Sequence, residues 1–334
     1  MKPDLLAILE AGYAVDAAEQ PWLTGLLAAA QPALDEGFGA FAFSYTARDS
    51  QSFEPRCLAS SGFPDALVER LPMVMAHMPG DYIETARNAQ ACILASEIDG
   101  FDAFVPQALN SVGAYDILGI NVLDPTGIGC YFGAPLPRRG GLTEARRATW
   151  GRVAAHVAAA FRIQRRFALG HPGENLRRAE AILDATGKVH HAAGPAELTT
   201  AREALRTATV AMEHARTKLR TSRPDQALDE WKGLVAARWS LVEHFESDGK
   251  RYILACENDP HVAGPSLLSP REQQVLAYAS LGHSSKLIAY ELGISDSTVR
   301  VLLARATTKL GARSRKEAIA TFTTATTASK KEPG

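Results

Sequence analysis

The chain has 334 residues, which at roughly 150 residues per domain predicts two or three domains. Its composition, 46% hydrophobic and 22% charged, allows a sizeable core and excludes a disordered or fibrous protein. The 36 Lys and Arg residues nearly balance 37 Asp and Glu, so the net charge of −1 by itself favours neither a nucleic-acid binder nor an acidic protein.

The sequence shows no sign of a membrane span, an export signal or a metal site. Its apolar runs, such as residues 153–161, fall well short of the roughly 20 residues that cross a bilayer. Asp4 and Glu10 interrupt the region that would be the apolar part of a signal peptide. The cysteines are far apart and form no C-x-x-C, which argues against a disulfide framework or a zinc site. We therefore expect a cytoplasmic protein without membrane association, metal or cofactor.

A first domain is predicted over residues 1–169. Helical patterns occupy residues 5–34, and strand-like runs follow at 38–45 and 53–60, before a helical stretch at 64–77. Two further β-rich runs flank the turn signal Asp124-Pro125-Thr126 and predict a hairpin over residues 115–133.

This first domain ends in a long helix. Thr143 is a plausible N-cap after Gly140-Gly141, and the pattern continues to Phe167. Apolar residues recur at helical spacing on this exit helix, which makes it the first candidate for a dimer seam; they are Val153, Val157, Ala160 and Phe161.

A coupling region is predicted over residues 174–259, after the Gly170-His-Pro-Gly173 linker. Short strands are expected within 181–190, and a hairpin over 239–256 turns near Asp248-Gly249. Between them, apolar residues recur every seven positions: Leu198, Leu205, Met212 and Leu219. This stripe fits a second dimer seam or, equally, a helix packed on a small sheet.

A helical third domain is predicted over residues 266–325. Ser269-Pro270-Arg271-Glu272 has the form of a capping box with Pro at the first helical position. A short second helix, 286–291, would be capped by Ser284 or Ser285, and Gly293 suits a turn that needs a positive φ. Ser295 would then cap a third helix.

The third helix has an apolar and a polar side. Val299, Leu303, Ala306 and Leu310 are spaced as one buried face, and basic residues lie mostly off it. Residues 266–334 hold ten basic and five acidic residues, a net charge of +5, which leaves −6 for the remainder. Two short helices joined by a tight Gly-containing turn, the second with a basic outer face, are typical of a helix-turn-helix.

The third domain resembles the LuxR-type (FixJ/NarL-type) DNA-binding domain of bacterial transcription regulators. The residues that carry the resemblance are Leu268-Ser-Pro-Arg-Glu272, Val275-Leu276, Gly282, Lys286, Ile288-Ala289, Leu292-Gly-Ile-Ser295, Thr298-Val299-Arg300, Lys309-Leu310-Gly311 and Arg313-Ser314-Arg315. The resemblance implies a recognition helix over about 296–310 in the major groove of double-stranded DNA. It also implies a homodimer that reads two half-sites, with RNA polymerase as a candidate partner.

Within this helix, Arg300 is the best candidate for a base contact, because its planar fork can pair with guanine. Base contacts are predicted for Ser297, Arg300, Val301 and Ala304, and phosphate contacts for Ser284, Lys286, Thr298, Arg305 and Lys309. Members of the family commonly have His where this chain has Leu302 and a polar residue where it has Ala304. Direct readout is therefore expected to be sparse, and either DNA shape contributes or specificity is loose.

The order of elements in residues 1–169 resembles a GAF-type sensor, and that of residues 174–259 resembles a PAS-like unit. The predicted fold is thus an α+β GAF/PAS-like sensor region followed by an all-α four-helix domain. Candidate pocket residues are Met73, Met75, Met78, Phe43 and Tyr45. The sensor would bind a small molecule or, alternatively, serve as a dimerisation or protein-interaction module. An enzyme is not expected, because the sequence holds neither G-x-S-x-G nor H-E-x-x-H.

Overall fold

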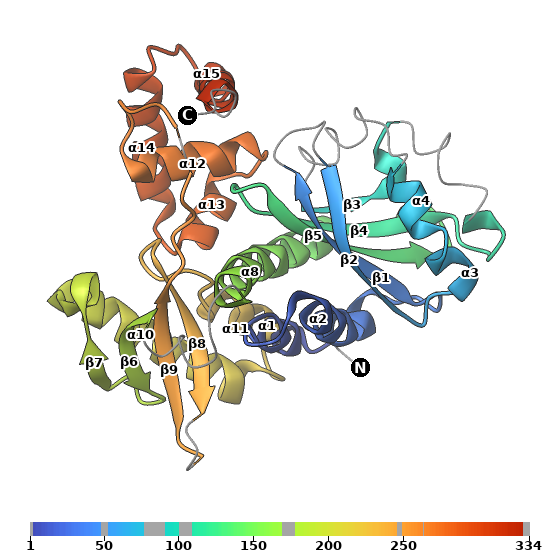
Figure 1. The fold of residues 1–334 in the computed structure, drawn as a ribbon, viewed down its shortest axis with the longest axis horizontal. Coiled ribbons are helices and arrows are strands. Elements are labelled where there is room, and N and C mark those ends of the chain that lie inside the picture. Colours follow the sequence, from blue (N-terminus) through green and yellow to red (C-terminus); the bar gives the residue numbers. More distant parts are fainter. Residues whose placement is uncertain are drawn as a thin grey trace.

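The computed structural model describes residues 3–47, 53–76, 91–99, 109–168, 178–245, 249–262 and 264–329. Two antiparallel sheets and a helical C-terminal domain are arranged around one long helix, α8, at Glu144–Ala168 (Figure 1). No helix in these ranges is both long enough and apolar enough to span a membrane.

The first sheet has five strands in the order β2-β1-β5-β4-β3. In chain order they are β1 (Ala40–Ala47), β2 (Phe53–Ser61), β3 (Cys92–Leu94), β4 (Asp116–Leu123) and β5 (Ile128–Leu136). The predicted hairpin is confirmed, since β4 pairs with β5 from Asp116↔Leu136 to Leu123↔Gly129. One face of the sheet is covered by α8 and by α1 (Leu5–Gly12) and α2 (Glu19–Leu34) (Figure 1).

The stretch predicted to be helical over residues 64–77 is helical in its described part but is interrupted. The chain forms two short helices, α3 (Asp65–Val68) and α4 (Leu71–Ala76), and His77 lies outside the described residues. Pro72 explains the break, because it has no N–H to continue the hydrogen bonding of α3 and is tolerated only in the first turn of a new helix.

The second sheet has four strands in the order β7-β6-β9-β8. Its strands are β6 (Ala179–Asp184), β7 (Val189–Ala192), β8 (Trp239–Phe245) and β9 (Arg251–Glu257). The antiparallel pairs β6–β7 and β8–β9 confirm the strands expected within 181–190 and the hairpin expected over 239–256. Between the hairpins run the 3-10 helix η2 (Gly194–Glu197), α10 (Thr199–His214), the π-helical turn η3 (Ala215–Leu219) and α11 (Pro224–Glu230).

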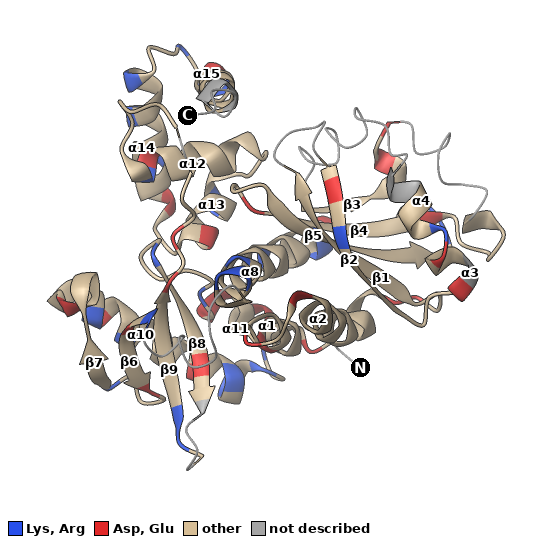
Figure 2. Ribbon diagram, in the orientation of Figure 1, with Lys and Arg blue, Asp and Glu red and all other residues tan. Residues whose placement is uncertain are grey.

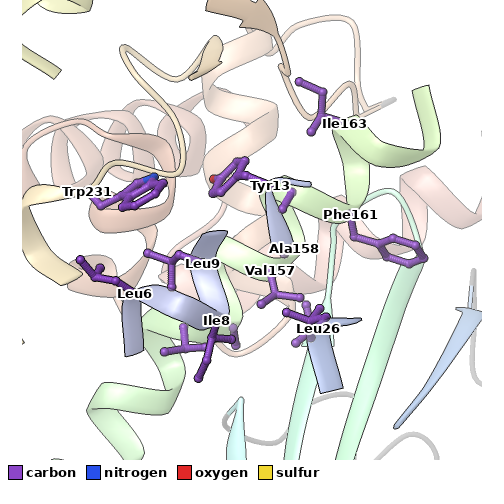
Figure 3. Close-up of a cluster of buried hydrophobic side chains, with 14 of the residues drawn as sticks. Leu6, Ile8, Leu9, Tyr13, Leu26, Val157, Ala158, Phe161, Ile163 and Trp231 are labelled. Carbon is purple, nitrogen blue, oxygen red and sulfur yellow. The ribbon is translucent and has the colours of Figure 1, made fainter. Parts of the chain in front are cut away.

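The two sheets share one core. A single cluster of buried side chains runs from Leu5 to Cys256 and includes residues of both sheets and of α1, α2, α8 and α10. Tyr13, after α1, stacks on Trp231 with ring centroids 6.1 Å apart (Figure 3). Arg220 pairs with both Asp4 and Glu10. The linker predicted at 170–173 therefore separates two segments of sequence but not two cores.

Neither of the two predicted dimer seams is available to a second chain, because both apolar stripes are buried within this chain. On α8, the side chains of Val153, Val157, Ala160 and Phe161 are buried within the chain, and Phe161 stacks on Trp22 at 4.9 Å. On α10 and η3, the stripe packs into the shared core and leaves only Leu198, at its start, 64% exposed. A helix on a sheet needs an apolar stripe as much as a coiled coil does, and the intrachain partners were too distant in sequence to foresee.

The C-terminal domain consists of α12 (Pro270–Ser280), α13 (Ser285–Leu292), α14 (Asp296–Lys309) and α15 (Arg315–Ser329). Its own buried cluster is separate from the shared core of the two sheets. It sits beside α8, with α13 nearest (Figure 1).

Candidate nucleic-acid interface

Side-chain caps fix where each helix of the C-terminal domain begins. The Ser269 hydroxyl accepts from the Glu272 N–H (3.4 Å), and the Glu272 carboxylate accepts from the Ser269 N–H (2.8 Å), which confirms the predicted capping box. Ser284 rather than Ser285 caps α13, since its hydroxyl accepts from the Leu287 N–H at 3.2 Å.

The turn between α13 and α14 has the expected geometry. Gly293 has φ +61° and ends α13 in the left-handed conformation, which a residue with a Cβ adopts only with strain. Two residues later the Ser295 hydroxyl accepts from the Thr298 N–H at 3.1 Å and starts α14. The turn thus sets the angle between α13 and α14.

One side of α14 is buried in the domain and the other faces solvent. Val299, Leu303 and Ala306 pack with side chains of α12, α13 and α15. Leu302 is half-buried against the same cluster, so its place in the core accounts for an apolar residue there. The exposed side carries Ser297, Thr298, Arg300, Val301, Ala304, Arg305 and Thr308.

All the residues predicted to contact bases lie on this exposed side. Arg300 has a side chain that is 73% exposed, and its Nη2 lies 2.5 Å from a carboxylate oxygen of Asp296, one turn earlier. Such a solvated pair contributes at most about 1 kcal/mol, so the guanidinium can exchange Asp296 for another acceptor at small cost. Val301 is 48% exposed beside it and offers a methyl-sized apolar contact.

The residues predicted to contact phosphates divide into two groups. Four of them are exposed. Ser284 and Lys286 lie at the start of α13, Thr298 lies in the first turn of α14, and Arg305 lies further along α14. Lys309, in contrast, binds the carboxylate of Glu272 at 2.7 Å. Burial alone would raise the pKa of Glu272, but hydrogen bonds from Lys309 and Ser269 lower it below its ordinary value. Lys309 therefore links α14 to α12 and would have to leave Glu272 to reach a phosphate.

Two contacts around the α12–α13 turn, made by Arg315 of α15 and by His283, were not predicted from the sequence. Arg315 donates to the His283 carbonyl (2.8 Å) and to the Ser285 hydroxyl (3.2 Å). His283 Nδ1 lies 2.9 Å from the Glu291 carboxylate, and both side chains are nearly buried. Burial alone would lower the pKa of His283, but the charge of Glu291 raises it above the ordinary value. Neither contact has a signature in local spacing.

The candidate pocket residues of the first sheet are only partly brought together. Phe43 and Tyr45 lie side by side on β1, with ring centroids 6.0 Å apart, on the face opposite α1, α2 and α8. Met73 lies on α4 and is 65% exposed. Of Met75 only the backbone is described, and Met78 lies outside the described residues.

Aromatic rings cover this outer face of the sheet, which is called the aromatic face below. Phe41, Phe43 and Tyr45 of β1 and Tyr131 of β5 form it with Phe53 and Phe63. Close approach is possible because β5 places glycines under the rings: a Cβ at Gly133 would overlap the ring of Phe41. Within the described ranges, no group of three or more His, Cys, Asp or Glu side chains is placed to hold a metal ion.

Residues 266–322 match the family model of bacterial regulatory proteins of the luxR family. These residues are therefore a LuxR-type helix-turn-helix DNA-binding domain, as the sequence resemblance predicted. Among solved structures, the chain is similar to Escherichia coli SdiA, with a TM-score of 0.29 and 10% identity over 91% of this chain and 90% of that chain. SdiA in complex with octanoyl-rac-glycerol gives a TM-score of 0.29 and 11% identity over 96% and 95%. No curated protein sequence matches the chain.

Proposed function

We propose that this chain is a sequence-specific DNA-binding transcription regulator that reads base edges with α14 in the major groove. The single observation that carries the proposal is the two-sided α14 within a LuxR-type domain. Its apolar side is locked into the domain, and its exposed side presents the predicted base contacts, Ser297, Arg300, Val301 and Ala304. The +5 charge of residues 266–334 supplies attraction to phosphates, and the Lys and Arg positions among the described residues are blue in Figure 2.

Arg300 and Lys286 have different roles in this proposal. Arg300 would pair with a guanine and so contribute to sequence preference, whereas Lys286, exposed near the start of α13, would contact a phosphate and contribute to affinity alone. Ser284, Thr298 and Arg305 would add phosphate contacts around it.

The test compares two alanine variants on DNA selected from a random library by the wild-type protein. Arg300→Ala should lose about 1–3 kcal/mol of binding free energy and relax the preference at one base pair. Lys286→Ala should weaken all sequences equally and reduce the slope of log affinity against log salt by about one unit. Arg206→Ala, which removes an exposed arginine from α10, is the matched control. Unchanged binding by both variants would contradict the proposed orientation.

The sheet region is proposed to be a GAF-like sensor of a small molecule that contacts the aromatic face. The five-stranded sheet, with α1, α2 and α8 on one face, supports this proposal. On the other face, the cavity lined by Ile8, Ile120, Phe132 and neighbouring side chains of the described residues measures only about 10 Å³, about the space of one water molecule at most.

The filled inner face also favours a second candidate, in which the sensor-like domain binds no small molecule and acts as a dimerisation or protein-interaction module. Native mass spectrometry of the purified protein separates the two. A co-purifying compound that Phe43→Ala abolishes supports sensing, and a protein of sequence mass alone, with no thermal shift from any compound in a metabolite library, supports the module.

A homodimer on DNA is part of the proposal, with a contact surface other than the buried stripes of α8 and α10. Analytical ultracentrifugation with and without selected DNA tests it. A complex of one chain per duplex at saturation would contradict it.

A further inference from the structure

The DNA-binding domain is held against the rest of the chain by polar contacts on the side away from the exposed face of α14. Tyr290, on α13, donates its hydroxyl hydrogen to the Leu228 carbonyl at 2.7 Å. The same oxygen lies 2.7 Å from Nε2 of His156 on α8 and must accept from it, because a hydroxyl has a single hydrogen to donate. Burial lowers the pKa of His156 to about 3, so the ring is neutral and carries its hydrogen on Nε2.

A buried arginine makes a second contact. Arg162 of α8 binds the carboxylate of Asp124 in the β4–β5 turn and donates to Asn258 through Nε, at 3.0 Å to the side-chain oxygen. Its Nη1 also lies 3.5 Å from the hydroxyl of Tyr278 on α12. Both charged groups are nearly fully buried. Arg162, on α8, thus connects the β4–β5 turn, the chain directly after β9 (Arg251–Glu257) and the DNA-binding domain.

The segment between α11 and β8 makes the third contact. Ala236 and Ala237 have φ values of +50° and +55°, a conformation that costs free energy for residues with a Cβ. Their carbonyls accept from Arg271 of α12 at 3.0 and 2.5 Å. Leu234 and Ala237 are buried in the cluster of the DNA-binding domain, and a Cβ on Gly293 would overlap the Leu234 carbonyl. The strained segment makes these contacts only when the DNA-binding domain is docked in the observed position.

These contacts have the character of a specific but separable interface. Buried ion pairs and shared hydrogen bonds contribute little net stability over apolar packing, because desolvation offsets them, yet they penalise any other alignment strongly. The exposed face of α14 takes no part, since Ser297, Arg300 and Ala304 remain exposed while the domain is docked. Docking therefore fixes the direction of the recognition helix without covering it.

The contacts also reach the face proposed for ligand binding. Leu281, at the end of α12, is buried in the same cluster as Phe41, Phe43 and Tyr45. Asp124 sits in the turn that joins β4 and β5, and β5 carries Tyr131 of the aromatic face. A rearrangement of the aromatic face would act on the docked domain at both points.

We propose that the contacts around Tyr290, Arg162 and Arg271 form a releasable latch that sets the orientation of the DNA-binding domain, with Asp124 and Leu281 as the points where the sheet acts on it. This inference rests on the proposed function for its consequence, which is control of the spacing between two recognition helices. The existence of the latch does not depend on DNA binding.

The first experiment is hydrogen exchange by mass spectrometry on full-length variants without DNA. Tyr290→Ala and Asp124→Asn should each raise exchange in α13 and in residues 257–262 by roughly tenfold, and leave α14 and β5 unchanged. Tyr115→Phe, which removes the hydroxyl of an exposed tyrosine, is the control and should change nothing. Tyr290→Phe, which keeps the ring, should give a smaller effect in the same segments. Unchanged exchange in both main variants, or a uniform rise across the chain, would overturn the latch.

The second experiment measures affinity for the selected duplexes after base pairs are inserted at their centres. The wild-type protein should prefer one spacing, and Tyr290→Ala should lose that preference by about tenfold while it binds a single half-site as well as the wild type does. A retained preference would overturn the orientation role. If no variant binds DNA, the proposed function fails, and the exchange pattern alone decides whether the latch exists.

Discussion

The DNA-binding domain and the two-sheet unit are built on different ranges of interaction. In residues 266–329, each helix start is fixed by a serine that bonds an amide three residues later, and the core lies within one short segment apart from Leu234 and Ala237. In the two-sheet unit, β6 pairs with β9 across about 70 residues of chain, and Arg220 reaches Asp4. Local rules therefore describe the first region nearly completely, whereas the second depends on contacts that no window of sequence contains.

The largest expected effect tests whether the two regions are separate folding units. Phe161→Ala should lower the unfolding free energy of the two-sheet unit by about 3–5 kcal/mol, because it leaves a cavity beside Trp22. Phe322→Ala should instead destabilise the DNA-binding domain. The four tryptophans all lie before residue 240, so their fluorescence in urea follows the two-sheet unit, and circular dichroism follows both. If fluorescence and circular dichroism report the same single unfolding transition in both variants, the two regions are not separate folding units.

The second effect is a difference in pH dependence between the buried His156 and the nearly buried His283. His156 has its pKa lowered to about 3 by burial, so the unfolded chain binds a proton at pH values where the folded chain does not. Stability should therefore fall as the pH drops from about 6.5 towards 3, by up to about 1.4 kcal/mol per pH unit.

His283, in the DNA-binding domain, should behave in the opposite way. Its pKa is raised beside Glu291, although burial acts against this, so its contribution is fully present below about pH 6.5 and is lost as the pH rises through the folded value. Urea titrations of His156→Gln and His283→Gln between about pH 4 and 8 measure both signs. Parallel pH profiles in the two variants would refute the assignment.

The smallest effect contrasts two glycines within the two-sheet unit. Gly133→Ala should cost about 1–3 kcal/mol, because the new methyl group meets the ring of Phe41 on the aromatic face. Gly151→Ala, in α8, should stabilise by about 0.4–1 kcal/mol, since nothing lies within 4 Å of the new Cβ. Thermal unfolding of both variants checks this, and equal melting temperatures would mean that the rings move aside freely.

Much of the domain order could be predicted from sequence, since turn and cap residues act on their neighbours. Asp124-Pro125-Thr126, Ser269 and Gly293 marked their turns and caps correctly. The length of α8 was also expected, and the Thr143 hydroxyl does accept from the Arg146 N–H at 3.2 Å. The use of its apolar stripe was not, because a stripe shows that a face is buried but not what buries it.

The sequence by itself determined the helix-turn-helix and its exposed basic face. It also showed that the net charge of −1 is the sum of +5 in residues 266–334 and −6 in the rest of the chain. Only the tertiary structure decided that the two sheets share one core and that Arg162, a charge in the apolar exit helix, belongs at the contact with the DNA-binding domain. The physical reason is distance along the chain. Asp124 and Tyr278 are brought to Arg162 only after the sheets and helices have packed, whereas a cap or a tight turn is complete within one turn of helix.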